Sequence, residues 1–279
     1  MKRLALAVFA FVFAAGPACA DDFENSLVEL HEEYHSPQHF ALELKGGPYS
    51  PDIDSTPGLL GKPFSELFNN RNDASKKGMR PAGKPLITIE FDWQFWHPFG
   101  SFALAASAGV QHRTTHAFEY LAQDAGGNRA SCPLDQCVRS GDETALTVFP
   151  LTLELAYRFD VLALRYKVPL VPYLKGGLGY YFWFVQRGDS SLAASLVTKD
   201  DPSEHKAIGG TLGLVAHPGL ALMLDILDPS AARTLDTELG INHTYVFFEL
   251  NYAWINGLGF KDKMVFSDLT WNTGMAFEF

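Results

Sequence analysis

The chain predicts an all-β fold: an eight-stranded antiparallel transmembrane β-barrel of the outer-membrane type, with a short N-terminal periplasmic helix. Period-two alternation of apolar and polar residues recurs along the sequence, as it does in half-buried strands. Beyond the N-terminus no run of about 20 apolar residues exists to form a transmembrane helix. Any membrane span must therefore be a closed barrel, which pairs every backbone group.

The C-terminal residues 272–279 give the most specific signal. They alternate polar and apolar residues and end on a phenylalanine. Asn272, Gly274, Phe277 and Phe279 match, position by position, the pattern that the bacterial outer-membrane assembly machinery recognises in C-terminal strands. Single strands of such barrels carry weak signals, so this match adds to the alternation elsewhere in the chain.

The N-terminus predicts export. A basic start precedes a short apolar segment, and the small residues Ala18 and Ala20 flank Cys19 at a cleavage site, as in a secretory signal peptide. Residues 16–18 lack the leucine-type residue of a lipoprotein signal. We therefore expect a signal peptide at 1–20, a periplasmic segment at 21–37 and an outer-membrane barrel at 38–279, with cleavage near Ala20.

Cleavage after Ala20 leaves two cysteines, Cys132 and Cys137. An even pair in an exported chain predicts a disulfide. Free thiols are the alternative, and zinc is disfavoured because no second pair of ligands lies nearby in the sequence. The short loop that the disulfide closes gains little entropy, so its role would be to stiffen the tip of an outer loop.

Eight alternating segments account for the predicted strands. An even number puts both termini on the periplasmic side. The links after the first, third, fifth and seventh strands then face outward, while the link after the sixth is long and contains a predicted helix at 229–239, with Asp228 as N-cap and Gly240 as C-cap. For residues 220–224 the sequence allows two interpretations, an extension of the sixth strand or a segment at the membrane interface. The predicted strands are 39–45, 86–96, 101–112, 144–159, 172–187, 205–217, 244–254 and 266–279.

One face of these strands is apolar and rich in aromatic residues, whereas the other carries charges of both signs. Aromatic residues near strand ends fit the belts at the two membrane interfaces. A soluble barrel is the alternative, with its apolar face inward. The mixed charges instead indicate a narrow lumen crossed by ion pairs and filled by side chains. The predicted girdle residues are Trp93, Trp96, Tyr157, Phe159, Tyr180, Tyr252, Trp254 and Trp271. The predicted lumen charges are Glu43, Lys45, Glu90, Asp92, Glu154, Arg158, Lys175, Arg187 and Glu249.

Six segments carry a resemblance to known proteins: 39–45, 47–54, 169–173, 228–233, 240–245 and 276–279. Together they resemble a family of uncharacterised outer-membrane β-barrel proteins found in myxobacteria and their relatives. The resemblance covers nearly all of the chain after the signal peptide. It implies an outer-membrane barrel, and it implies no reaction and no catalytic residues.

Two groups of residues could bind a metal ion or carry out catalysis. His31 and His35 match the H-E-x-x-H spacing that binds zinc on a helix, but too few residues precede them to enclose a catalytic domain. A charged periplasmic helix is the preferred interpretation, with weak metal binding as the alternative. Ser107, His112, His116 and Glu119 lie near one strand end, where a lipid-A-modifying enzyme would need them to converge.

The sequence therefore favours a structural or surface-interaction role, with no enzyme activity, no catalytic residue and no cofactor assigned. A narrow channel for small solutes and a lipid-A-modifying enzyme are the alternatives. The expected partners are the lipid bilayer of the outer membrane, the outer-membrane assembly machinery and an extracellular ligand. The formal net charge of −10 argues against nucleic acid.

Overall fold

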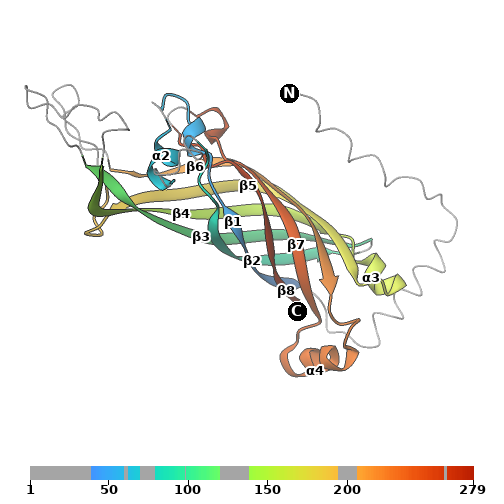
Figure 1. Ribbon diagram of the computed structural model, residues 1–279. Coiled ribbons are helices and arrows are strands. Elements are labelled where there is room, and N and C mark those ends of the chain that lie inside the picture. Colours follow the sequence, from blue (N-terminus) through green and yellow to red (C-terminus); the bar gives the residue numbers. More distant parts are fainter. Residues whose placement is uncertain are drawn as a thin grey trace, which may run out of the picture. The chain divides into compact units, whose positions relative to one another are not determined.

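The computed structural model describes residues 39–59, 62–69, 79–97, 99–119, 138–193, 206–260 and 263–279. Its strands form a closed barrel in chain order, in which β8 pairs with β1, every neighbour being antiparallel (Figure 1). The predicted fold class is confirmed. The eight strands are β1 (Phe40–Tyr49), β2 (Lys84–Trp96), β3 (Ser101–Glu119), β4 (Val138–Arg158), β5 (Leu170–Arg187), β6 (Ile208–Met223), β7 (His243–Trp254) and β8 (Asp268–Glu278).

Some predictions fall outside the described residues. These are the signal peptide at 1–20, the periplasmic segment at 21–37 with His31 and His35, and the cysteine pair Cys132 and Cys137. They stay predictions. In the described part of the chain, the helices are too short or too polar to span a bilayer.

Short helical elements connect the strands at both ends of the barrel. At the end that holds the C-terminus, α3 (Val161–Tyr166) follows β4, and α4 (Pro229–Leu239) follows β6. At the other end, η1 (Ile53–Ser55) and α2 (Pro63–Phe68) follow β1, while η3 (Gly257–Gly259) follows β7. The C-terminal end is periplasmic in single-chain outer-membrane barrels, so η1, α2 and η3 belong to the outer end.

The helix at 229–239 agrees with its prediction, including both caps. The Asp228 carboxylate accepts hydrogen bonds from the backbone N–H groups of Ser230 and Ala231, and Gly240 ends the helix at φ 69°. The left-handed backbone conformation at this position costs glycine less free energy than any other residue. The open question about 220–224 is settled as strand extension, because β6 continues to Met223 and Leu222 pairs with Leu170.

Strands β3 and β4 are longer than the sequence predicted. They contain 19 and 21 residues, whereas about 9–11 residues cross a bilayer. The extension of β3 beyond residue 112 carries polar outward residues such as Thr114 and His116, both exposed. The apolar alternation ends there, which is why the sequence pattern stopped short of the true strand ends.

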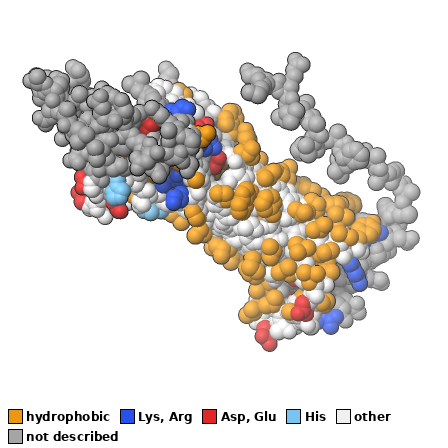
Figure 2. All heavy atoms as spheres, viewed as in Figure 1, with side chains coloured by type: hydrophobic (Ala, Val, Ile, Leu, Met, Phe, Trp, Pro, Cys, Tyr) orange, Lys and Arg blue, Asp and Glu red, His pale blue; other side chains and the backbone are white. Residues whose placement is uncertain are grey.

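The outer surface of the barrel is apolar over a broad belt (Figure 2). Trp93, Tyr252, Trp254 and Trp271 are among its exposed aromatic residues. Trp96 joins them because the register shifts between Gln94 and Trp96, and such a bulge lets two successive side chains leave the strict alternation. A soluble barrel, the alternative interpretation, would have its apolar face inward. The outward position of the apolar belt excludes it.

Glycine at position 274 allows the last strand to close against the first. Gly274 faces the barrel interior opposite Lys45, and a Cβ added there would lie 2.2 Å from the backbone oxygen of Leu44. No side chain fits at that distance without moving a strand. The glycine of the C-terminal signal therefore also has a packing role at the closing seam.

We predict that Gly274→Ala destabilises the folded barrel by about 1–3 kcal/mol, the usual cost of forcing an extra carbon into a packed site. Urea unfolding in detergent, followed by tryptophan fluorescence and heat-modifiable gel mobility, measures the loss. Gly46→Ala is the matched control, because it lies on the same seam and its added Cβ would be 3.5 Å from the nearest atom. Equal stability of the two variants would contradict the packing role.

Candidate functional site

The buried charges lie inside the barrel at the level of the membrane belt. Eight predicted lumen residues are buried, and Lys175, Asp92 and Glu249 have 0% exposure. Arg187 is a correction: it shares the inward alternation of β5 but is exposed, because it ends the strand beyond the packed interior. The lumen cluster consists of Glu43, Lys45, Glu90, Asp92, Glu154, Arg158, Lys175, His217, Glu249 and Glu278.

Arg158, the last residue of β4, connects three strands across the lumen. Its guanidinium contacts Glu43, lies 2.5 Å from Asp92 and lies 2.7 Å from Glu278. These carboxylates come from β1, β2 and β8. Because a planar guanidinium offers five donors in a fixed fork, one arginine can bridge all three strands.

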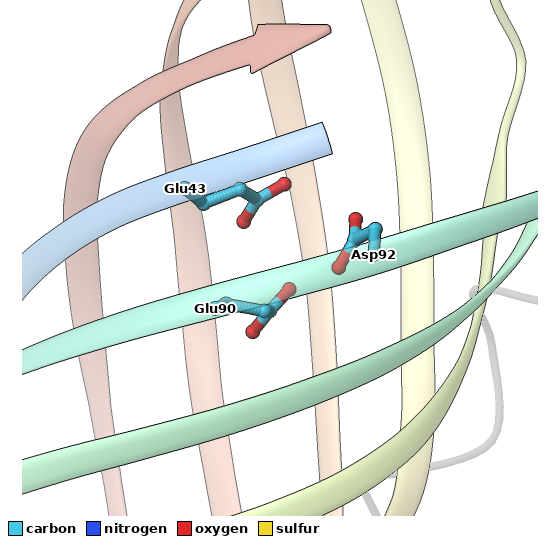
Figure 3. Close-up of side chains that lie close together, drawn as sticks. All are labelled: Glu43, Glu90 and Asp92. Carbon is cyan, nitrogen blue, oxygen red and sulfur yellow. The ribbon is translucent and has the colours of Figure 1, made fainter. Parts of the chain in front are cut away.

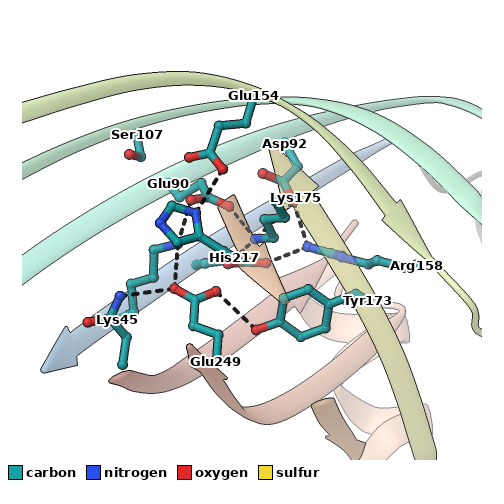
Figure 4. Close-up of polar contacts among 12 residues, drawn as sticks. Lys45, Glu90, Asp92, Ser107, Glu154, Arg158, Tyr173, Lys175, His217 and Glu249 are labelled. Atoms are coloured by element: carbon teal, nitrogen blue, oxygen red, sulfur yellow. Dashed lines mark hydrogen bonds and ion pairs between the residues drawn. The ribbon is translucent and has the colours of Figure 1, made fainter. Parts of the chain in front are cut away.

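Two lysines continue the network along the barrel axis (Figure 4). The Lys175 ammonium contacts Glu90 and lies 2.6 Å from Glu43. The Lys45 ammonium lies 2.7 Å from Glu90 and 3.1 Å from Glu249. Glu90 therefore accepts from both lysines, and the network ties β1, β2, β5 and β7 together.

Neutral donors add hydrogen bonds to two carboxylates that also pair with a cation. The Tyr245 hydroxyl donates to Glu278 over 2.9 Å, and the Tyr173 hydroxyl donates to Glu249 over 3.1 Å. Asn272 also donates to Glu249, over 3.0 Å. This buried asparagine, predicted as part of the C-terminal assembly signal, thus also belongs to the polar interior.

The sequence pattern did not identify His217 as a lumen residue. His217 Nδ1 lies 2.8 Å from Glu154, and its Nε2 lies 3.0 Å from Asn251. The predicted strand ended at this histidine within a glycine-rich segment, which hid its inward position. Glu278 shares the inward alternation of Asn272 and Gly274, which places it on the charged face of β8, and it is buried.

Glu43, Glu90 and Asp92 bring carboxylate oxygens within 4.8 Å of one another (Figure 3), a spacing suited to a metal ion. The donor set fits a hard cation. However, the Lys175 ammonium contacts Glu43 and Glu90 and lies 3.9 Å from Asp92. This ammonium takes the place that an ion would need, so the arrangement is that of an ion-pair network.

Apolar side chains pack inside the barrel beyond the cluster, toward the outer end. Tyr49, Ile53, Phe64 and Phe266 belong to one buried group. Ile53 and Phe64 come from the segment after β1, which folds back into the barrel mouth. The Asp54 carboxylate fixes this segment by accepting the backbone N–H groups of Phe64 and Ser65 over 2.8 and 2.9 Å.

A second apolar layer packs toward the periplasmic end. Ala163 of α3 joins Val171, Met223 and Phe247 there, with Ile226 from the link after β6 packed against them. Between this layer and the charges, a cavity of about 10 Å³ borders Glu43 and Arg158. A space of this size holds about one water molecule.

The residues considered for a lipid-modifying enzyme do not converge. Ser107 faces the interior, where its hydroxyl lies 2.7 Å from that of Thr152. His112 and His116 are exposed on the opposite face of β3, and His112 Nδ1 lies 2.9 Å from the Thr147 hydroxyl. The side chain of Glu119 lies outside the described residues. Because a nucleophile and its base must meet, Ser107 and these histidines form no dyad.

A closed eight-stranded barrel with an outward apolar belt and a buried polar interior defines the class of this chain. It is a β-barrel of the bacterial outer-membrane class, since only closed barrels and helices satisfy the backbone within lipid. No protein-family model and no curated protein matches the chain. The resemblance to a myxobacterial family stays a prediction.

Solved structures of the same class are similar in fold. The attachment invasion locus protein Ail of Yersinia pestis is 10% identical, with 87% of this chain and 97% of that chain covered and a TM-score of 0.34. Neisserial surface protein A is 11% identical (88% and 98% covered, TM-score 0.38). OprG from Pseudomonas aeruginosa is 14% identical (88% and 98% covered, TM-score 0.37). Because these sequence identities and TM-scores are low, we infer no function from these structures.

We predict that Arg158→Met lowers the free energy of unfolding by about 3–5 kcal/mol, because it leaves buried carboxylates without their cation. Urea titration of the refolded protein measures this. Arg187→Met is the matched control: it removes the same group from an exposed position, where substitutions usually change stability by no more than about 0.5 kcal/mol. Similar losses in both variants would contradict the structural role of the cluster.

Asp160, in the link between β4 and α3, gives a pH-dependent prediction. Burial raises the pKa of its carboxyl to about 7, with the nearby Glu278 adding to the shift. The folded protein therefore binds this proton more tightly than the unfolded chain, whose pKa is the usual 3.8. The contribution to stability is complete below that value and falls as pH rises toward 7. Asp160→Asn should flatten the stability profile between about pH 4 and 7, and an unchanged profile would contradict the shift.

Proposed function

We propose that this chain is a non-conducting outer-membrane barrel with a structural or surface-interaction role. The observation that carries the proposal is the layered filling of the lumen. An apolar group around Tyr49 and Phe266, the lumen cluster, and an apolar group around Val171 and Phe247 follow one another along the axis. A channel for small solutes needs a continuous polar path, and two apolar layers interrupt it.

The route of the chain to the membrane is part of the proposal. The signal peptide would be cleaved near Ala20, and the assembly machinery would read Asn272, Gly274, Phe277 and Phe279. The terminal phenylalanine supports this role because its backbone N–H donates to the Phe40 oxygen over 2.9 Å, while its own oxygen accepts from Phe40 over 2.8 Å. Phe279 thus takes part in the seam between β8 and β1.

Interaction would take place at the outer end. Segments there fold into ordered elements instead of simply linking strands: η1 and α2 lie over the barrel mouth, where Thr115 of β3 donates to the Leu67 oxygen over 2.8 Å. The guanidinium of Arg113 stacks on Phe64 and Phe68, 5.3 and 5.6 Å from their ring centres. These packed elements suit recognition, because little ordering is left to occur in them on binding.

We predict no steady single-channel steps when the refolded protein is inserted into a planar bilayer. Heat-modifiable gel mobility of the same preparation verifies that the barrel is folded, and a porin inserted in parallel verifies that the bilayer reports open pores. Reproducible unitary conductance from the folded protein would contradict the closed lumen and make solute transport the leading function.

A further inference from the structure

A groove of about 830 Å³ opens at the outer end of the barrel. One wall comes from the segment around η1, including Asp52 and Ser55. The other comes from the link between β7 and β8, including Asn256 and Lys263. The two segments lie side by side above the barrel (Figure 1, blue and orange-red). The volume falls within the range of about 300–1,000 Å³ that small-molecule sites occupy.

Hydrogen bonds between the two walls hold the groove in shape. The backbone N–H of Val265 donates to the Thr56 hydroxyl over 3.0 Å. The backbone N–H of Asp52 donates to the backbone oxygen of Ser267, also over 3.0 Å. Beneath them, the Tyr49 hydroxyl donates to the Phe266 oxygen over 2.8 Å. The walls are thus joined to each other and to the packed barrel mouth, so the groove exists before any ligand arrives.

The link between β7 and β8 bends sharply beside the groove. Three successive residues, Gly257, Leu258 and Gly259, have positive φ values of 83, 48 and 91°. Leucine is strained in this region, and strained residues persist where the surrounding structure fixes them, commonly at ligand sites. The Asn256 side chain supports the bend by accepting the Leu258 N–H over 3.0 Å.

Aromatic faces and balanced polar groups line the groove. Trp254 and Phe260 are 44% and 66% exposed. The Asn256 amide keeps its NH₂ group as a donor, and the Ser267 hydroxyl, which accepts the Ile255 N–H over 3.0 Å, keeps its proton. Asp52 supplies an acceptor and Lys263 a donor.

The charges of the described residues in and beside the groove lining balance one another. Arg80 lies 3.4 Å from Asp52 and 2.7 Å from Asp268. With Lys263 in the lining, two cations balance these two carboxylates. A balanced field does not favour an anionic ligand such as phosphate. It suits a neutral ligand that both donates and accepts hydrogen bonds and presents a flat apolar face to an aromatic ring.

We propose that this groove binds carbohydrate, through a pyranose ring stacked on Trp254 or Phe260 with its hydroxyls bonded to Asp52, Asn256, Lys263 and Ser267. This inference rests on the proposed surface-interaction role. Trp254 is the last residue of β7 and belongs to the outward belt, so the groove opens where headgroups meet the protein. The sugar can therefore come from a glycolipid of the outer leaflet or from a free glycan.

The test uses the full mature chain, labelled with 5-fluorotryptophan and folded in phospholipid nanodiscs, with the Trp254 resonance assigned from a Trp254→Phe variant. The probes are a delipidated lipopolysaccharide core oligosaccharide added to the solution, and intact rough lipopolysaccharide incorporated in the disc. Inorganic phosphate is the anion control. We expect a saccharide probe to shift the Trp254 signal and phosphate to leave it unchanged.

A response to the free oligosaccharide alone identifies a soluble glycan as the ligand, and a stronger response to the intact molecule identifies the glycolipid. By calorimetry, Trp254→Ala should weaken binding about tenfold. Trp271→Ala is the matched control, because Trp271 is 45% exposed on the next strand and lies outside the groove lining. Lys263→Ala, at an exposed loop position, should also weaken binding if Trp254→Ala does not fold.

The inference is overturned if neither saccharide probe shifts Trp254, if phosphate gives the same shift, or if both tryptophan variants lose affinity equally. Conductance of the same protein separates this result from the wider proposal. A non-conducting barrel without saccharide binding would overturn the groove ligand alone, whereas a conducting barrel would overturn the closed lumen.

Discussion

Compensation of buried charge inside the barrel is the constraint on which the rest of the structure depends. Desolvating a carboxylate or an ammonium costs several kcal/mol, which the partner repays only if the geometry is good. Here Arg158, Lys175 and Lys45 each contact two or more carboxylates. Since these side chains arise from strands far apart around the barrel, pairing them fixes the register and the closure of the sheet together.

The apolar layers at both ends follow from the same constraint. Water entering the lumen would screen the ion pairs and hydrate the separated charges, so side chains that exclude water strengthen the network. At the outer end this layer is built from Ile53 and Phe64 of the segment after β1. Folding that segment inward also creates one wall of the outer groove, because η1 then lies beside the link between β7 and β8. The closed interior and the outer groove thus have a common origin.

The sequence predicted most of the barrel because the alternation of apolar and polar residues indicates both where a strand runs and which of its side chains face the lumen. Inward positions such as Glu43 and Lys175 were predicted from parity alone, and their burial agrees. Parity does not report depth, so Arg187 was placed in the lumen although it lies beyond the packed interior. Strict alternation alone would turn Trp96 inward, but a bulge turns it outward, in agreement with its prediction as a girdle residue.

Other features required contacts between distant parts of the chain. Nothing local indicates that Tyr49 donates to Phe266, or that Thr56 accepts from Val265, across more than 200 residues. His217 was missed because the glycines around it weaken the strand pattern in β6. The packing role of Gly274 became visible only when the oxygen of Leu44 was placed against it.

A double-mutant cycle between Lys175 and Glu90 tests the central claim most directly. The free energy of unfolding is measured for the parent protein, Lys175→Met, Glu90→Gln and the double variant. Each single change removes one partner from a buried charge and should cost about 3 kcal/mol or more. If charge pairing sustains the barrel, the double variant loses less than the sum of the singles by at least about 1 kcal/mol. Additive losses, within about 0.5 kcal/mol, would show that the two residues act independently and would contradict the account.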